Sequence, residues 1–591
     1  MTRINGIALY NCFVSGYESL LMEKKRINDI NVFPVADGDT GNNMASTLYA
    51  ITQIPEVSPS ASRTLAVIAD RALSGARGNS GIIIAQFLNG LASECADREY
   101  LTAREIGAAL RKASASTYRA VENPREGTLI TVLRVWSEEM ERLAHIARDV
   151  RCVFADALTA AREALEKTTE QLDALKKARV VDAGASGFVA FLEGIARMIA
   201  TGSVPASRVS RQVESMEESA HDIPEDVGAV TYAYCTEALL VRRTPSPEIP
   251  LRESLKKLGD SLIVSEGLEK TKVHIHTDEP ARVFLILRDY GKIVEQKVDD
   301  MRLQFAATHH PVSRIAIVTD SIADIPRELV ERYQIHVIPT KILWGDDEYL
   351  DRLTITADTF YPYLDERPEY PGSSVPDPRR VEQVFSWLSA HYESIVAISV
   401  GKRLSGCWQV MESAARRLRD GGYPIAVIDS RLNSAAQGLV ALSAAESAAC
   451  GHPFEGIVAL ANDAIARARI FVSVATFKYM VRGGRVSALK GLIAAVTNLK
   501  PIVSLDSEGK GIAFAASFSQ NGSKRKILRH VAKNRAAISR YAVVHAAAPE
   551  LAREYARELE ALLGKAPEYV MEISPAVGIH AGIGAVAVAY L

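Results

Sequence analysis

The sequence predicts a multidomain chain: an all-α segment, then a small α/β unit, then a longer α/β region. Three observations predict this order. The chain has 591 residues, its periodicity changes from helical to strand-like near residue 230, and strands alternate with helices from residue 314 onward. Because single domains usually hold about 100–200 residues, a chain of this length should contain several separate cores.

The first 200 residues are expected to be helical. Residues 103–120 and 153–175 place apolar side chains three and four positions apart, the spacing of one helix face. Residues 203–226 then become rich in serine and glutamate, a composition typical of linkers. A domain boundary is therefore expected there.

Short strands are expected in the rest of the chain. In the middle unit they flank a helical stretch at residues 251–258, and in the last region they alternate with helices, which predicts a parallel or mixed sheet covered by helices. The predicted strands are residues 231–240, 272–276, 315–318, 335–339, 395–400 and 425–428. We therefore predict domains at residues 1–202, 227–305 and 314–591.

Composition excludes several classes of protein. With 69 basic and 71 acidic residues the net charge is -2, so there is no overall positive field for binding nucleic acid. Six cysteines without a CxxC pair indicate reduced thiols rather than a disulfide framework. The N-terminus lacks the features of a secretory leader and the longest apolar runs are short, so we expect a cytoplasmic protein without a membrane span.

The densest chemical motif is NVFPVADGDTGNNM, residues 31–44. Asp37 and Asp39, separated by one glycine, can converge on a hard cation such as Mg²⁺ from a tight turn. The hydroxyl of Thr40 and the following amides lie where a helix should begin, and free amides at a helix start attract phosphate. An Asp-Gly-Asp sequence is also common in ordinary surface turns, so the surrounding motifs must decide.

Cysteine and histidine side chains form a second candidate site. His274 and His276 are two residues apart on a predicted strand and thus share a face, and Cys235 lies on an earlier strand. One thiolate and two imidazoles could hold Zn²⁺ with an open fourth position. The alternative is that both histidines are packing or surface residues.

The first 200 residues resemble the ATP-binding domain shared by the DhaL subunit of dihydroxyacetone kinase and fatty acid kinase. The likeness rests on residues 31–44, on SGARGNSG at 74–81, on EGT at 126–128 and on VDAGASG at 181–187, in family order. It implies a helical barrel that holds two Mg²⁺ ions and cradles the ATP phosphates at glycine-rich helix starts; none of these segments has the P-loop spacing. The implied metal ligands are Asp37, Asp39 and Asn31, and the implied ATP-binding residues are Thr40, Asn43, Gly78, Ser80, Gly127, Thr128, Asp182 and Gly184.

The middle unit is similar to the middle domain of fatty acid kinase. The similarity rests on residues 234–237, 258–262 and 272–277. In that family the matching cysteine and histidines are implicated in activity. The resemblance therefore implies a catalytic role for Cys235, His274 and His276.

Residues 314–591 resemble DegV proteins, which hold a fatty acid between two α/β lobes and present its carboxylate to the kinase. The matching stretches are residues 319–321, 371–376, 404–406, 428–430, 479–487 and 574–584. The resemblance implies that Ser373, Ser374, Ser405 and His580 bind the acid and that Arg485 offsets charge during phosphoryl transfer.

This region departs from the DegV pattern near the expected carboxylate site. Gly401 and Lys402 replace two family serines, and Ser373 and Val375 replace the usual threonine and glutamine. The identity of the acid and its chain length therefore stay open.

The expected function is phosphorylation of a bound fatty acid by MgATP, giving an acyl phosphate and ADP. Transfer would occur within one chain, across a short connector, or between two chains of a homodimer. One alternative is a kinase for another small carboxylate or a dihydroxyacetone-like ketone, although no acceptor domain of the DhaK type is present. Another is a lipid-binding or sensing protein with a nucleotide switch and no turnover.

Overall fold

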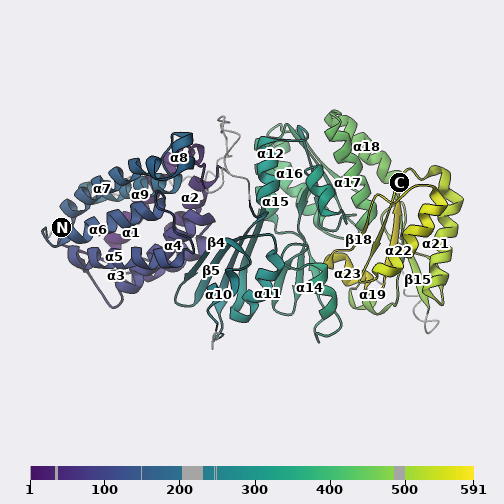
Figure 1. The fold of residues 1–591 in the computed structure, drawn as a ribbon, viewed down its shortest axis with the longest axis horizontal. Helices are drawn as coiled ribbons and strands as arrows, with labels where there is room; N and C mark the ends of the chain where they lie inside the picture. Colours follow the sequence, from purple (N-terminus) through teal and green to yellow (C-terminus); the bar gives the residue numbers. More distant parts are fainter. Residues whose placement is uncertain are drawn as a thin grey trace. The chain divides into compact units, whose positions relative to one another are not determined.

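Figure 1 shows the chain as a computed structural model. The structure describes residues 2–33, 38–147, 149–202, 231–244, 247, 249–484 and 499–591. The chain divides into two compact units, the first ending at Phe305 and the second beginning at Ala306. The predicted linker at residues 203–226 lies outside the described residues.

The first part of unit one is a helical bundle (Figure 1). Its all-α prediction is confirmed apart from two short strands, β1 (Arg3–Ile4) and β2 (Leu101–Thr102), which pair antiparallel. The predicted helix at 153–175 is broken at Leu172, so it becomes two helices, α7 and α8. The helices are α1 (Gly6–Asp29), α2 (Thr40–Thr52), α3 (Ala61–Gly75), α4 (Gly78–Glu94), α5 (Ala103–Ala120), α6 (Leu129–Ala144), α7 (Val150–Gln171), α8 (Asp173–Ala178) and α9 (Ala183–Thr201).

Helix α9 is the core helix of this bundle. It crosses α1 closely, since a Cβ added to Gly194 would lie 2.2 Å from the carbonyl oxygen of Ser15. By length and composition α9 could cross a membrane, which the apolar runs of the sequence did not indicate. However, 72% of its apolar window is buried inside the protein, as is typical of a core helix.

The second part of unit one is a four-stranded antiparallel sheet in the order β4-β5-β3-β6. The sheet packs on the helical bundle: Ser265 donates to Gln86 Oε1 at 2.7 Å, and Leu239 and Ile263 join the bundle's hydrophobic core. Its elements are β3 (Tyr234–Arg242), α10 (Leu251–Leu255), β4 (Gly259–Glu266), β5 (Lys270–Thr277), α11 (Pro280–Tyr290), β6 (Gly291–Asp300) and α12 (Met301–His309).

Unit two contains two main sheets, which confirms the predicted α/β region. A parallel sheet has the order β13-β12-β7-β8, and a six-stranded sheet has the order β16-β15-β14-β19-β17-β18 with one parallel pair. A three-stranded sheet, β10-β9-β11, accompanies them. One hydrophobic cluster joins the two main sheets, because Ile317 and Val396 belong to it together with Ile470 and Ala587.

The strands and helices of unit two alternate along much of the chain. The strands are β7 (Ile315–Asp320), β8 (His336–Ile338), β9 (Lys341–Trp344), β10 (Asp347–Leu350), β11 (Gly372–Ser374), β12 (Ser394–Ser399), β13 (Ile425–Asp429), β14 (Arg469–Ser473), β15 (Lys500–Leu505), β16 (Gly511–Ser517), β17 (Tyr541–His545), β18 (Val570–Glu572) and β19 (Val586–Tyr590). The helices are α13 (Arg327–Arg332), α14 (Ala357–Phe360), α15 (Pro378–His391), α16 (Cys407–Asp420), α17 (Ser434–Ala449), α18 (Phe454–Arg467), α19 (Lys478–Arg482), α21 (Gln520–Asn534), α22 (Pro549–Leu563) and α23 (Pro575–Ala581), with 3-10 turns at Tyr361–Tyr363 and Arg535–Ala537.

Candidate functional site

Four helices of the bundle, α2, α4, α6 and α9, begin close to one another. A Cβ added to Gly78, at the start of α4, would lie 2.5 Å from Asn43 Nδ2 on α2. A Cβ on Gly184, at the start of α9, would lie 2.8 Å from Ser80 Oγ on α4 and 3.3 Å from Leu129 Cβ on α6. Because the first N–H groups of a helix have no partner within the helix, four converging starts make a site for an anion.

Asp182 joins two of these helix starts. Its Oδ1 accepts a hydrogen bond from the backbone N–H of Ala185 at 2.8 Å, which caps α9, and it also interacts with the backbone of Leu129. Burial raises the pKa of Asp182 to about 6, although both hydrogen bonds act in the opposite direction. Asp182 therefore positions the starts of α6 and α9 relative to each other.

The aspartate turn precedes α2. Asp39 is the N-cap residue, but its side chain makes no capping hydrogen bond. Instead, Oδ1 of Asn28 on α1 accepts hydrogen bonds from the N–H groups of Gly41 at 2.8 Å and Asn42 at 3.3 Å. The Asp39 carboxylate is thus not needed to cap the helix. Asn31 is buried, at 3% exposure, and Asp37 lies outside the described residues.

The remaining predicted nucleotide residues also lie at helix starts. Thr40 is the buried first residue of α2. Thr128 is the N-cap of α6, with its hydroxyl donated to the carbonyl of Arg125 at 2.8 Å, and Gly127 donates its N–H to Thr131 Oγ1 at 2.9 Å. The structure thus places all the described residues of this predicted group at the starts of α2, α4, α6 and α9.

Sequence reasoning missed two side chains at this end of the bundle. Asn28 caps α2, as described above, and Asn79 is the second residue of α4. Within the described part of the chain, Oδ1 of Asn79 is buried without a hydrogen-bond partner. Such an oxygen fits a site that is completed by a ligand or a cation. Asn79 belongs to the SGARGNSG motif, and its amide side chain was the available signal.

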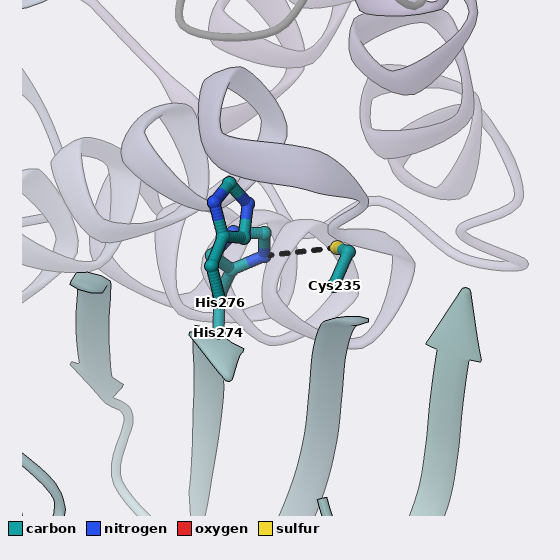
Figure 2. Close-up of side chains that lie close together, drawn as sticks. All are labelled: Cys235, His274 and His276. Carbon is teal, nitrogen blue, oxygen red and sulfur yellow. Dashed lines mark hydrogen bonds between the residues drawn. The ribbon is translucent and has the colours of Figure 1, made fainter. Parts of the chain in front are cut away.

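Cys235, His274 and His276 form a cluster on the middle sheet. Figure 2 shows their side chains projecting from two neighbouring strands toward the helices. Cys235 on β3 pairs in register with His276 on β5, and the distance from Cys235 Sγ to His274 Nδ1 is 3.9 Å. The three ligand atoms lie within 4.8 Å of one another. Among the described residues, Nε2 of His274 is buried without a partner, so the donor set fits a Zn²⁺ ion.

Two carboxylates lie behind these histidines. Nδ1 of His276 is 3.6 Å from Asp260 Oδ1, and Nδ1 of His274 is 3.6 Å from Glu237 Oε1. Burial lowers the pKa of His274, and a hydrogen bond from His276 lowers the pKa of Asp260. A carboxylate behind a metal-bound histidine orients the ring, which is the arrangement seen here.

The cysteine cluster and the aspartate turn interact electrostatically. Burial is the main cause that raises the pKa of Cys235, and the negative charge of Glu237 adds to it. The carboxylate of Asp39 contributes in the same direction. A thiol in this environment stays protonated at neutral pH unless a cation stabilises the thiolate.

In unit two, Ser373 and His580 come together from distant parts of the sequence. Ser373 Oγ on β11 lies 3.4 Å from His580 Nε2 on α23. A Cβ added to Gly483 would lie 2.4 Å from His580 Nδ1, so the loop after α19 also meets this histidine. Ser374 follows on β11. Arg485 lies two residues beyond Gly483, outside the described residues.

Ser405 lies on a loop beside the same strand. A Cβ on the next residue, Gly406, would lie 3.1 Å from Val375 Cγ1. The hydroxyl of Ser405 is 3.1 Å from the sulfur of Cys407 and accepts from that residue's N–H at 3.4 Å. In the structure the Ser405 hydroxyl therefore bonds at the start of α16.

The two basic residues that follow Gly401 face a different place. Lys402 and Arg403 line a cavity of about 760 Å³ whose lining includes neither Ser373, Ser374 nor His580. Lys402 Nζ lies 3.7 Å from Asp429 Oδ2, and Arg403 lies 3.6 Å from Glu508. Both cations thus have acidic partners away from the serine–histidine pair.

The fold and the sites define a class of protein: a kinase-type helical module with a small α/β domain, joined to a two-lobed α/β module. Family models specify each part. Residues 34–197 match the DAK2 domain, 231–308 the middle domain of the fatty acid kinase family, and 314–591 the DegV family. The chain therefore combines the domains of a fatty acid kinase with a DegV domain in one polypeptide.

Similar proteins cover parts of this chain. An uncharacterized protein of Staphylococcus epidermidis is 30% identical over 314 residues, which are 51% of this chain and 56% of that protein. An uncharacterized protein of Staphylococcus saprophyticus is 30% identical over 319 residues, with the same shares. The chain thus spans about half the length of these curated relatives.

Among solved structures, DegV from Bacillus subtilis, described as a fatty acid binding protein, is 26% identical with a TM-score of 0.43. A DegV family protein from Thermus thermophilus, described by its fatty acid binding, is 24% identical with a TM-score of 0.43. Each match covers 47% of this chain and 99% of the solved chain.

Proposed function

We propose that this protein transfers the γ-phosphoryl group of ATP to the carboxylate of a fatty acid, giving an acyl phosphate and ADP. One observation carries the proposal. Four helix starts converge beside the Asp39 turn, in a DAK2 domain that shares its chain with a DegV domain. The first feature suits a nucleotide triphosphate and the second an acid acceptor.

The nucleotide would lie with its phosphates at the starts of α2, α4 and α9. Backbone N–H groups there offer hydrogen bonds without any basic side chain, and Asn43 and Ser80 add side-chain contacts. Asp39, with Asn31 and Asp37, would hold Mg²⁺. When bound, the metal would supply charge neutralisation on the transferring phosphoryl group.

The acid would be held by unit two. Nε2 of His580 and Oγ of Ser373, 3.4 Å apart, can both donate to one carboxylate, with Ser374 beside them. Apolar side chains of the same region, Met480 and Ile579, belong to the hydrophobic cluster of unit two. Each methylene of an acyl chain buried in such a cluster contributes about 0.8 kcal/mol.

The reaction balances without an added acid or base. A carboxylate oxygen forms a bond to the γ-phosphorus while the bond from that phosphorus to the bridging oxygen of ADP breaks. An ionised carboxylate has no proton to lose. The chain therefore needs to align the two substrates and offset charge, the role that we assign to Arg485 by resemblance.

The cysteine–histidine cluster has a supporting role in this proposal. Cys235, His274 and His276 would hold Zn²⁺ at the edge of the nucleotide site, close enough for Asp39 to act on Cys235. The ion would fix the position of these side chains and stabilise the Cys235 thiolate.

Hydroxylamine trapping tests the function. Purified full-length protein is incubated with MgATP, hydroxylamine and fatty acids of several lengths, and hydroxamates are measured by mass spectrometry. We expect a hydroxamate from a long-chain acid. A product from dihydroxyacetone or a short carboxylate would instead support the alternative kinase, and bound lipid with bound ATP but no product would support the sensor.

Complementation decides whether transfer occurs within or between chains. Asp39→Ala protein lacks a metal ligand, and His580→Ala protein lacks an acceptor contact. If phosphoryl groups pass between two chains of a homodimer, mixing the two inactive proteins restores up to about a quarter of the activity. Transfer within one chain leaves the mixture inactive.

A further inference from the structure

Glu237 is a buried carboxylate that connects the middle sheet to the helical bundle. It lies on β3, two residues after Cys235, and is 1% exposed. Its Oε1 accepts a hydrogen bond from the backbone N–H of Gly78, the first residue of α4, at 2.8 Å. One of the helix-start donors of the proposed phosphate site is therefore bound by a side chain of another domain.

The same carboxylate also faces the cysteine–histidine cluster. Glu237 pairs in register with His274, and its Oε1, the atom that accepts from Gly78, lies 3.6 Å from His274 Nδ1. That nitrogen is in turn 3.9 Å from Cys235 Sγ (Figure 2). A continuous path thus runs from the proposed metal ligands through Glu237 to the start of α4.

Buried positive charge keeps Glu237 ionised. Its Oε2 lies 3.6 Å from Nζ of Lys272, which is also 1% exposed, and 4.0 Å from a guanidinium nitrogen of Arg77. Arg77 is the N-cap residue of α4 and also pairs with Glu295 at 3.5 Å. Burying two charges costs several kcal/mol before they attract each other, so a role in stability alone is a weak reason for this pair.

We propose that Glu237 is a positioning residue that couples nucleotide binding at the start of α4 to metal binding at Cys235, His274 and His276. The inference rests on the proposed function for the identity of the two sites. A metal-bound imidazole has one nitrogen as ligand and the other as N–H donor. Metal binding therefore decides whether His274 donates to Glu237, and Glu237 transmits that choice to Gly78 and Arg77.

The coupling is positive. A divalent cation beside Glu237 offsets negative charge close to the site that receives the phosphates. By linkage, nucleotide must then strengthen metal retention by the same factor as metal strengthens nucleotide binding. We expect a factor of about ten, within the usual range for coupled sites.

The test measures binding in the full-length chain, at a fixed excess of Mg²⁺. Calorimetry gives the Kd of a non-hydrolysable ATP analogue for chelator-treated protein and for protein loaded with Co²⁺, whose thiolate absorption reports occupancy of the cysteine cluster. Wild-type protein should bind the analogue about tenfold more tightly when loaded. In Glu237→Gln the ratio should fall below about twofold, with both ligands still bound.

Glu295→Gln is the matched control, since it removes the other carboxylate that pairs with Arg77 but leaves the Gly78 contact. It should keep the tenfold ratio. If Glu237→Gln does not fold, Glu237→Asp keeps the charge beside Lys272 with a shorter reach, and should also lose the coupling. Equal affinities of loaded and metal-free wild-type protein, or full coupling in a folded Glu237 variant, would overturn the proposal.

Hydroxamate formation by the same samples separates the two proposals. Coupling without any acyl phosphate contradicts the kinase assignment but leaves the link through Glu237 standing. Acyl phosphate formation without coupling contradicts the role of Glu237 alone.

Discussion

The phosphate end of the helical bundle and the serine–histidine pair of unit two are built from different materials. The first consists largely of backbone N–H groups at helix starts, packed so closely that a Cβ on Gly78 or Gly184 would come within 3 Å of a neighbour. The second consists of side chains, Ser373 on the edge strand β11 and His580 on α23, placed 3.4 Å apart.

This difference determines how each site tolerates sequence change. Backbone sites need glycine wherever a neighbouring helix would meet a side chain, so the residue type is fixed by space. Side-chain sites keep their fold when one polar residue replaces another. The departures from the DegV pattern, such as Ser373 and Val375, therefore fall where the fold accepts them and where ligand choice can change.

The strongest way to break the comparison is Asp39→Ala. Losing a carboxylate ligand of the proposed metal should reduce acyl phosphate formation at least about 100-fold, because metal charge stabilisation contributes several kcal/mol. Lipid retained by unit two should be unchanged. Asp156→Ala, on the exposed face of α7, is the control, and it should keep full activity. Normal turnover of Asp39→Ala would contradict the metal assignment.

His580→Ala tests the side-chain site. Removing one donor to a carboxylate should weaken fatty acid binding roughly 10- to 100-fold, since hydrogen bonds to charged groups contribute about 1.5–3 kcal/mol. Nucleotide affinity should not change. The measurement is the Kd of a fluorescent fatty acid, with the exposed His452→Ala as control. Equal affinity for the acid in wild-type and His580→Ala protein would remove His580 from the site.

Gly184→Ala tests the backbone site by adding one methyl group. The new Cβ would lie 2.8 Å from Ser80 Oγ and 3.3 Å from Leu129 Cβ, so the starts of α4 and α6 must shift. We expect about tenfold weaker binding of an ATP analogue, because crowding of this kind costs about 1–3 kcal/mol. Gly456→Ala in α18 meets its nearest neighbour at 3.5 Å and should bind nucleotide normally. Unchanged binding by Gly184→Ala would mean that the phosphates lie elsewhere.

Asp351→Asn should have the smallest effect on activity, and it concerns the support of His580. Asp351 is buried, and its Oδ1 accepts from Ala576 N–H in α23 at 3.1 Å. Burial raises the pKa of Asp351 to about 7, above the unfolded value of about 3.9. Its contribution to stability is therefore complete below about pH 4 and is lost as the pH rises through about 7.

In wild-type protein the free energy of opening α23, measured by hydrogen exchange, should fall across this pH range by up to about 4 kcal/mol. Asp351→Asn, which does not ionise, should reduce that slope, and the remaining slope would come from Asp324, whose pKa burial raises to about 6. The exposed Asp463→Asn should leave the slope unchanged. An identical slope in Asp351→Asn would show that Asp351 does not titrate in this range.

Much of the fold could be predicted from local pattern. Periodicity identified helix α5 with its observed bounds and the strands β7, β12 and β13 within about one or two residues, because a buried strand or helix face needs a regular apolar spacing. The break at Leu172 between α7 and α8 was not predicted, because the apolar spacing continues through it.

The candidate sites could be predicted in part. Asp39, Gly78 and Gly184 stood out because their motifs need particular residue types, and Cys235, His274 and His276 because metal ligands are few in kind. Asn28, Asn79 and Glu237 did not stand out, since amides and glutamates are common on protein surfaces.

The sequence by itself determined the domain order, the motifs at the helix starts and the residues able to bind a metal or a carboxylate. Only the tertiary structure decided that Glu237 reaches Gly78 from another domain, and that Lys402 faces Asp429 rather than His580. The physical reason is distance along the chain. Local preferences act over a few residues, whereas these contacts join side chains that meet only after the helices and sheets have packed.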